Sequence, residues 1–235
     1  MNHVYDLQII LPTYNEAVCI EKVINEWYQE LHRKINFCFI ITEDGSTDGT
    51  KEILKRLSKK YPMILSIKPR RSGYGAAMVR GIKLAKAKYI FCIDSDGQCP
   101  AKDFLKFWRN REKADVLIGW RAKRKHTFQR RLFSGFFKII YKALFPVKIH
   151  DPSCSYTLFS KKTSKKLLKN LGITKEAFWW EFVARAYSLG LTIKELKINH
   201  RSRSNGRTRV FQLKKLPQIF FTQLVAMFKI KKEYN

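Results

Sequence analysis

The sequence has no uninterrupted apolar run of the roughly 18 residues that a membrane-spanning helix needs. It reaches an apolar, strand-like run after only a few residues, without the longer apolar core of a secretory signal peptide. Its five cysteines are odd in number and show no paired spacing that suggests a zinc site. Cys38 and Cys92 lie inside apolar runs, where a small buried side chain is the usual interpretation. We therefore expect a reduced, cytosolic protein with no transmembrane helix.

Acidic residues are also scarce. Asp and Glu total 19 against 47 Lys and Arg, which gives a formal net charge of +28. Two long segments, 121–148 and 197–232, contain no carboxylate at all, and both are interleaved with bulky apolar residues. Such a surface attracts polyanions: nucleic acid, anionic lipid headgroups or phosphorylated substrates. Composition does not choose among these three classes of partner.

Apolar residues make up 45% of the 235 residues, enough for a sizeable core, and their spacing alternates between strand and helix. Strands are expected at 7–11, 37–42, 63–67, 89–93, 116–118, 156–159 and 191–198, and helices at 16–31, 51–60, 76–87, 128–145 and 175–189. An apolar tail at 211–230 is interrupted by Lys214, Lys215 and Pro217. Alternating strands and helices predict an α/β fold with a largely parallel sheet covered on both faces.

Polar clusters follow three of these strands: residues 12–16 (Pro-Thr-Tyr-Asn-Glu), 43–46 (Glu-Asp-Gly-Ser) and 94–98 (Asp-Ser-Asp-Gly-Gln). In open α/β sheets, ligands bind beyond the carboxyl ends of the strands. One crevice is therefore expected to collect all three clusters.

The acidic loop at 94–98 is a candidate metal site. In extended geometry, alternate side chains share a side, so Asp94, Asp96 and Gln98 could converge. Oxygen ligands suit Mg²⁺ or Mn²⁺, which neutralises the charge that develops on a diphosphate leaving group. The structural alternative is a solvated turn, because Asp and Gly favour turns. The segment 43–50 could likewise be only a capped turn between strand and helix, although a carboxylate at a strand end also suits ribose hydroxyls or a base.

Taken in order, these motifs resemble glycosyltransferase family 2, and within it the dolichyl- and polyprenyl-phosphate sugar synthases. The similarity extends to about residue 210 through Gly-Trp-Arg at 119–121, Arg-Arg at 130–131, Asp-Pro-Ser-Cys-Ser-Tyr at 151–156 and the basic run at 200–208. The resemblance implies a GT-A fold and an inverting, metal-dependent transfer of a sugar from a nucleotide diphosphate. A donor of the GDP-mannose or UDP-glucose type and a polyprenyl or dolichyl phosphate acceptor are implied.

The resemblance also implies site residues. The nucleotide sugar would be bound by Pro12, Tyr14, Glu16, Asp44 and Asp94, and Mg²⁺ or Mn²⁺ would be surrounded by Asp94, Asp96 and Gln98. The catalytic residues would be Asp96, Arg121, Arg131 and Arg203. The acceptor phosphate would be bound by Arg130, Arg203 and Arg209. Guanidinium groups match phosphate oxygens and stay charged. The sequence departs from the family at Glu43, Trp120, Arg209 and Ser155-Tyr156, which bears on sugar preference more than on reaction class.

The acceptor has two alternatives. A phosphate already carries a charged nucleophile, so it needs positioning and charge screening more than a general base. A hydroxyl of a glycan or glycolipid would need a base, and Glu181 is the candidate; otherwise Glu181 is a carboxylate on a helix surface. A third hypothesis, motivated by the charge alone, is a basic nucleic-acid-binding module, but no motif of that class is present.

Two stretches, 128–145 and 211–230, mix bulky apolar side chains with Lys and Arg. Helices of this kind lie in a membrane interface, attracted by apolar burial and anionic lipid, or else pack one face on a core. We therefore expect a GT-A domain at 1–210 and a basic amphipathic membrane-interface tail at 211–235. The protein would be peripheral on the cytoplasmic side of a membrane, attached directly or through an anchoring partner subunit.

Overall fold

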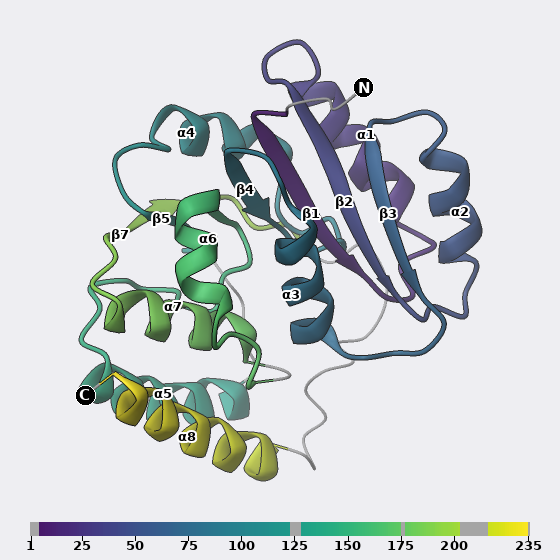
Figure 1. The fold of residues 1–235 in the computed structure, drawn as a ribbon. Coiled ribbons are helices and arrows are strands. Elements are labelled where there is room, and N and C mark those ends of the chain that lie inside the picture. Colours follow the sequence, from purple (N-terminus) through teal and green to yellow (C-terminus); the bar gives the residue numbers. More distant parts are fainter. Residues whose placement is uncertain (1–4, 123–127, 175–176, 203–215, 235) are drawn as a thin grey trace.

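The computed structural model describes residues 5–122, 128–174, 177–202 and 216–234, without the side chains of 128–134, 136 and 216–220. Within these residues a seven-stranded sheet has the order β3-β2-β1-β4-β6-β5-β7 (Figure 1). The strands are β1 (Leu7–Thr13), β2 (Phe37–Asp44), β3 (Met63–Lys68), β4 (Tyr89–Cys92), β5 (Val116–Trp120), β6 (Thr157–Ser160) and β7 (Ile193–Lys197). All seven predicted strands are present, with ends shifted by at most two residues.

The sheet is mostly parallel. β1 pairs in parallel with both β2 and β4, so that Ile9 lies opposite Phe39 on one side and Phe91 on the other. β2 pairs in parallel with β3, and β5 with β7. Only β6 runs antiparallel, to both β4 and β5. The carboxyl ends of β1, β2 and β4 therefore meet at one edge of the sheet.

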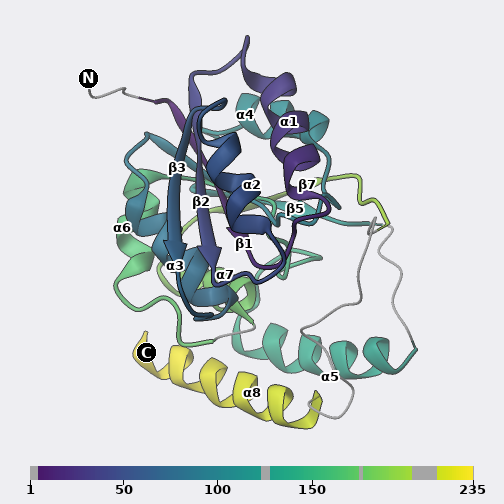
Figure 2. The ribbon, with the colours of Figure 1, turned by 90° about the vertical axis from the view of Figure 1, so that its right-hand side faces the viewer.

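Helices cover both faces, as predicted. Leu7, Ile9 and Leu11 of β1 point into one apolar cluster, and Ile10 points into another on the opposite face. The first cluster includes residues of α1 (Ile20–Leu31), α2 (Thr50–Leu57), α4 (Phe104–Arg109) and α5 (Phe128–Leu144), and the second residues of α3 (Tyr74–Leu84), α6 (Lys161–Leu168) and α7 (Phe178–Ser188). Figure 2 shows α1 and α2 on one side of β1–β3 and α3 and α6 on the other.

Local patterns explain most of these elements. In α1 the buried residues Ile20, Val23, Ile24, Trp27 and Leu31 recur at helical spacing. The helix begins at Ile20 and not at residue 16, because the preceding residues form the turn that bonds to neighbouring loops. The short helices α4 and α6 were not predicted, since α4 has only six residues and α6 contains only two apolar residues, Leu167 and Leu168.

The last helix, α8 (Leu216–Glu233), packs on α5 and α7 (Figure 1). Met227 and Ile230 are buried in the first apolar cluster, while Phe221, Val225 and Phe228 are exposed. Over the described part, the tail expected from residue 211 is thus a helix that shares the core. None of the described helices is both long enough and apolar enough to cross a membrane.

Candidate active site

The loops after β1 and β2 are fastened to each other by hydrogen bonds. The backbone N–H of Asn15 donates to Ser46 Oγ at 2.9 Å, and that of Glu16 donates to Thr50 Oγ1 at 3.0 Å. In return, the N–H of Thr47 donates to Asn15 Oδ1 at 2.8 Å. Small hydroxyl and amide side chains are suited to such loop-to-loop bonds. Residues 13–17 and 43–50 therefore form one continuous rim at the sheet edge.

The acidic loop joins the same rim. Ser95 Oγ donates to the carbonyl oxygen of Pro12 at 2.9 Å, and Cys19 Sγ lies 3.4 Å from the carbonyl oxygen of Ser95. Ser95 is itself buried. The prediction that the three polar strand ends gather in one place is confirmed.

Within the acidic loop, each proposed ligand has a defined orientation. Asp94 Oδ1 accepts a hydrogen bond from Tyr74 Oη at 2.7 Å, and Asp96 Oδ1 accepts one from the N–H of Gln98 at 3.0 Å. The side-chain amide of Gln98 donates to the carbonyl oxygen of Arg201 at 3.2 Å. Gln98 therefore ties the loop to the segment after β7, and only its amide oxygen could face a cation.

The donor set fits Mg²⁺ or Mn²⁺. Among the described residues there is no group of three or more His, Cys, Asp and Glu side chains that could enclose a metal ion. Mg²⁺ is ordinarily bound through one or two carboxylates together with substrate phosphates and water, and two carboxylates on one short loop supply that number. The loop is thus suited to a cation that arrives with a nucleotide diphosphate, and not to a closed structural metal site.

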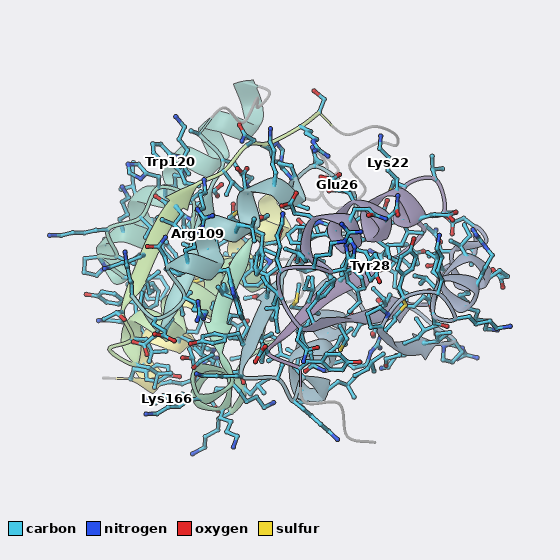
Figure 3. All side chains as sticks on the ribbon, turned by 90° about the horizontal axis from the view of Figure 1, so that it is seen from above. Lys22, Glu26, Tyr28, Arg109, Trp120 and Lys166 are labelled. Atoms are coloured by element: carbon cyan, nitrogen blue, oxygen red, sulfur yellow. The ribbon has the colours of Figure 1, made fainter. Side chains whose placement is uncertain are left out.

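The segment after β7 also lies against this edge. Arg201 pairs with Glu26 of α1 through contacts of 2.7 and 3.0 Å, and its N–H donates to the carbonyl oxygen of Gln98 at 2.8 Å. Burial works to raise the pKa of Glu26, but the bonds from Arg201 and from the N–H of Ala101 outweigh it, so that this pKa is lowered. Figure 3 shows Glu26 and Lys22 on α1, on the opposite side of the picture from Trp120.

Asp44 is at the end of β2 and is buried at 3% exposure. Its Oδ2 accepts a hydrogen bond from the N–H of Gly73 at 2.7 Å, and its carboxylate also accepts from the N–H and hydroxyl of Ser72. Gly73 precedes α3, so the carboxylate binds at that helix's amino end, where negative charge is favoured. The sequence did not reveal that Asp44 anchors this loop.

Gly45 permits a close approach of two backbones. It has a φ of +79°, and a Cβ there would lie 2.6 Å from the backbone nitrogen of Arg71. We expect Gly45→Ala to destabilise the fold by about 1–3 kcal/mol more than Gly49→Ala, because only Gly45 adds a clash with backbone to the cost of a positive φ. Gly49 is the matched control, since it has a φ of +87° and nothing lies within 4 Å of the position that a Cβ would take. Thermal unfolding of both variants checks this, and equal losses would contradict it.

Tyr14 is on the rim, and the guanidinium of Arg71 lies 4.3 Å from its ring centroid. A cation over an aromatic face is attracted by the ring quadrupole. Arg71 was not predicted, because a basic residue in a short connecting loop has no periodic or motif signal. Glu16 also lies on the rim, and its Oε2 accepts from Cys19 Sγ at 3.0 Å.

Arg121 has protein partners that the sequence did not indicate. Its guanidinium is buried and paired with Asp151 through contacts of 2.7 and 3.0 Å, with Ser153 Oγ at 2.9 Å, and its assignment to a phosphate stays a prediction. Burial favours loss of the proton, but neighbouring Cys154 and Asp151 raise the pKa of Arg121 above its ordinary value. In this structure Arg121 holds the loop before β6. Trp120 points elsewhere and stacks on His150 at a centroid distance of 4.3 Å.

Glu181 also differs from both expectations. It is fully buried in α7, so it is not a surface carboxylate. Its Oε1 accepts from the N–H groups of Gly172 and Ile173 and from Arg185, and its Oε2 accepts from the N–H and hydroxyl of Thr174. A carboxylate with both oxygens used in this way is a structural group, and the geometry does not present it as a base.

The remaining predicted residues are the basic ones. Arg203 and Arg209 lie outside the described residues. Arg130 and Arg131 are in the first turn of α5, and their side chains are outside the description as well. Their assignment to the acceptor phosphate stays a prediction.

Two aromatic residues complete the site. Tyr74, the first residue of α3, bonds to Asp94, and Trp179 Nε1 donates to Tyr74 Oη at 2.8 Å. Burial and then the charge of Asp94 raise the pKa of Tyr74 well above its usual value, so the phenol keeps its proton at neutral pH. No motif marked either residue.

Comparison with known proteins agrees with this geometry. The family described as Glycosyl transferase family 2 matches residues 8–168, more than half of the chain. The chain belongs to glycosyltransferase family 2. Among similar curated proteins, this glycosyltransferase is 27% identical over 252 residues to the dolichyl-phosphate beta-glucosyltransferase of Dictyostelium discoideum, covering 96% of the chain and 77% of that protein. It is 28% identical over 221 residues to the Drosophila melanogaster protein of the same name, covering 82% and 66%.

Solved structures support the GT-A fold. Glucosyl-3-phosphoglycerate synthase from Mycobacterium tuberculosis, in complex with UDP, superposes with a TM-score of 0.69 at 17% identity, covering 97% of this chain and 80% of that one. A mannosyltransferase from Pyrobaculum calidifontis, in complex with GDP-Man and Mn²⁺, gives 0.67 at 16% identity, covering 96% and 65%. At this identity the likeness concerns the fold alone, and it agrees with the mostly parallel sheet and flanking helices.

Proposed function

We propose that this glycosyltransferase transfers glucose from UDP-glucose to dolichyl phosphate or a related polyprenyl phosphate, with inversion, at the cytosolic surface of a membrane. The observation that carries the proposal is the meeting of the acidic loop with the two other strand-end loops on one rim, bonded through Ser95, Pro12 and Asn15. A single edge therefore offers carboxylates for a cation and a polar rim for a nucleotide.

The relatives supply the substrate classes. The curated proteins similar to this chain are named dolichyl-phosphate beta-glucosyltransferases, which favours glucose and a lipid phosphate. A β-linked product from an α-linked nucleotide sugar requires inversion at the anomeric carbon. The structural neighbours hold UDP or GDP-Man, so the fold does not decide the base. UDP is proposed because a neighbour named for a glucosyl product, the glucosyl-3-phosphoglycerate synthase, holds UDP.

Mg²⁺ or Mn²⁺, held by Asp94 and Asp96, would neutralise charge on the diphosphate leaving group. The protein's own residues contribute by positioning the two substrates. The 43–50 loop and Tyr14 form the rim against which the nucleotide binds, and Asp44 fixes the 72–73 loop beside it. The phosphate oxygen of the acceptor is already charged at neutral pH, so its attack on the anomeric carbon needs orientation more than proton removal. Arg130, Arg131, Arg203 and Arg209 are the cations proposed to screen that phosphate.

A phosphate acceptor agrees with the site better than a hydroxyl does. The hydroxyl alternative depended on Glu181 as a base, and both oxygens of Glu181 are committed inside α7 and the 172–174 turn. The hypothesis of a nucleic-acid-binding module rested on net charge alone. Membership of the glycosyltransferase family favours an enzyme over such a module.

The proposal is tested with purified protein, dolichyl phosphate and Mn²⁺, with labelled UDP-glucose, GDP-mannose and UDP-N-acetylglucosamine in separate reactions. Label is expected in the organic phase with UDP-glucose and is expected to disappear with EDTA. Label in the organic phase only with GDP-mannose would show that the donor is GDP-mannose and not UDP-glucose. No label in any organic phase, while donor is bound or hydrolysed, would argue against a lipid acceptor.

The membrane surface is proposed from α5 and α8. Phe221, Val225 and Phe228 of α8 are 68%, 54% and 57% exposed at positions that share a helix face, and Ile139 of the neighbouring α5 is 69% exposed. Lysines 138, 142, 229 and 232 lie on the same two helices and are exposed. In Figures 1 and 2 the arrowheads of β1–β3 point towards the side of the molecule where α5 and α8 lie. A bilayer there would present lipid phosphates to the site edge.

We expect the combined substitutions Phe221→Ser, Val225→Ser and Phe228→Ser to reduce binding to vesicles containing anionic lipid about a hundredfold, because apolar burial supplies much of interfacial binding. Co-sedimentation at low and high salt measures this, and high salt should weaken wild-type binding through the lysines. The matched control is Ile64→Ser with Leu84→Ser, two side chains each 38% exposed on β3 and α3. Equal binding of the triple variant and the control would exclude this surface.

A further inference from the structure

A chain of hydrogen bonds connects α7 to the acidic loop through α3. Trp179 Nε1 donates to Tyr74 Oη at 2.8 Å, and Tyr74 Oη donates to Asp94 Oδ1 at 2.7 Å. The three residues come from three separate parts of the chain: the second position of α7, the first position of α3 and the second residue after β4. Neither aromatic residue belongs to the motifs that indicated the family.

The direction of both bonds follows from chemistry. An indole N–H can only donate, so the oxygen of Tyr74 must be the acceptor in its bond with Trp179. The single hydrogen of the Tyr74 hydroxyl is then left for Asp94, which accepts it as a carboxylate. Trp179 therefore determines where the hydroxyl hydrogen points.

Packing fixes the two aromatic side chains. Trp179 is 5% exposed, and its ring lies 5.0 Å from that of Phe178 and 5.3 Å from that of Phe182, centroid to centroid. The Tyr74 ring meets Phe178 edge-on at 6.3 Å. A phenylalanine in place of Tyr74 would fill the same apolar space, so packing alone accounts for the ring and leaves the hydroxyl unexplained.

We propose that Tyr74 is a positioning residue that orients the carboxylate of Asp94 for the metal–nucleotide complex, and that Trp179 acts through Tyr74 by holding its hydroxyl. The inference rests on the proposed metal site at Asp94 and Asp96. It adds that α7 is coupled to the nucleotide-sugar site. A shift of Trp179 would move the Tyr74 hydroxyl, which donates the hydrogen bond to Asp94. Groups that orient a metal ligand are known to change metal affinity by about 10- to 100-fold when removed.

The experiment compares wild type, Tyr74→Phe, Trp179→Phe and the double variant. The affinity for Mn²⁺ in the presence of UDP is measured from the electron paramagnetic resonance signal of free Mn²⁺. We expect Tyr74→Phe to weaken Mn²⁺ binding about tenfold and Trp179→Phe to weaken it about threefold. The double variant should match Tyr74→Phe alone, because Trp179 has no effect without the hydroxyl.

A second measurement needs neither metal nor activity. In protein labelled with ¹⁵N at the tryptophan indoles, the Trp179 resonance should move upfield in Tyr74→Phe because its acceptor is lost. The matched control is Tyr89→Phe, whose hydroxyl donates to Glu112 at 3.3 Å away from the acidic loop. That variant should leave both the Mn²⁺ affinity and the Trp179 resonance unchanged.

The outcomes separate this inference from the proposed function. Wild-type affinity of Tyr74→Phe for Mn²⁺ with UDP, with only a lower melting temperature, would overturn it, as would additive effects in the double variant. If the wild type binds Mn²⁺ with neither UDP nor GDP, the metal site and this inference fall together. If the coupling is observed but no sugar reaches dolichyl phosphate, the positioning role holds and only the proposed acceptor fails.

Discussion

Replacing Asp96 by Asn is expected to reduce sugar transfer about a thousandfold while the protein stays folded. The substitution keeps size and one oxygen but removes the charge that would hold the cation at the leaving diphosphate, an interaction of several kcal/mol in the transition state. Asp96 lies on a turn beside the buried strand β4, and its contact with the N–H of Gln98 at 3.0 Å can be kept by the asparagine oxygen. The measurement is the rate of transfer at saturating donor, together with the melting temperature.

A carboxylate far from the site provides the control for Asp96. Asp115 stands just before β5, where it accepts from the N–H and hydroxyl of Thr192 at 2.9 and 2.8 Å. Asp115→Asn should transfer sugar at nearly the wild-type rate. An Asp96→Asn variant that keeps a third or more of the wild-type rate would mean that the acidic loop is not the metal site.

Replacing Glu181 by Gln is expected to unfold the protein at a much lower temperature. Five donors converge on its two oxygens, and an amide has only one oxygen, so its NH₂ group would face donors. Arg185, which is fully buried, would also lose a charge partner at 3.0 Å. Breaking a buried ion pair on one side costs about 3–5 kcal/mol, which corresponds to a melting temperature lower by about 10 °C for a chain of this size.

The same variant separates a structural role from catalysis. If Glu181 only supports α7, the folded Glu181→Gln protein assayed well below its melting temperature should transfer sugar within a few-fold of the wild-type rate. Loss of a general base would instead lower the rate about 10²- to 10⁴-fold with an unchanged melting temperature. The control is Glu21→Gln, which loses an exposed pair with Arg56 and should melt close to wild type.

The sequence predicted those parts of the fold that have strong periodic signals. The strands at 7–13 and 37–44 contain the apolar runs 9–11 and 37–41, and the polar residues at their carboxyl ends meet on one rim because parallel strands end at the same edge. The ordered motifs then identified the family before any geometry was known. The antiparallel β6 was not foreseeable, because a four-residue strand gives no sign of its direction.

The partners of two predicted site residues could not be foreseen, for one reason. Arg121 stands inside a motif and Glu181 outside the motifs, and a sequence does not show whether a charge faces a substrate or a buried partner. Asp151 lies 30 positions from Arg121, and Thr174 bonds to Glu181 only because a turn folds back on α7. Tyr74 and Trp179, 105 positions apart, were missed for the same reason, since their meaning depends on a contact that no local pattern contains.

The central claim is that the sugar is joined to a lipid phosphate, and the most direct test is the chemistry of the product. The organic-phase product of the reaction with UDP-glucose should show a ³¹P signal of a phosphodiester in place of the monoester of dolichyl phosphate, and mild acid should release the glucose. An unchanged monoester signal, with glucose in an acid-stable glycoside, would contradict the claim and make a hydroxyl group the acceptor.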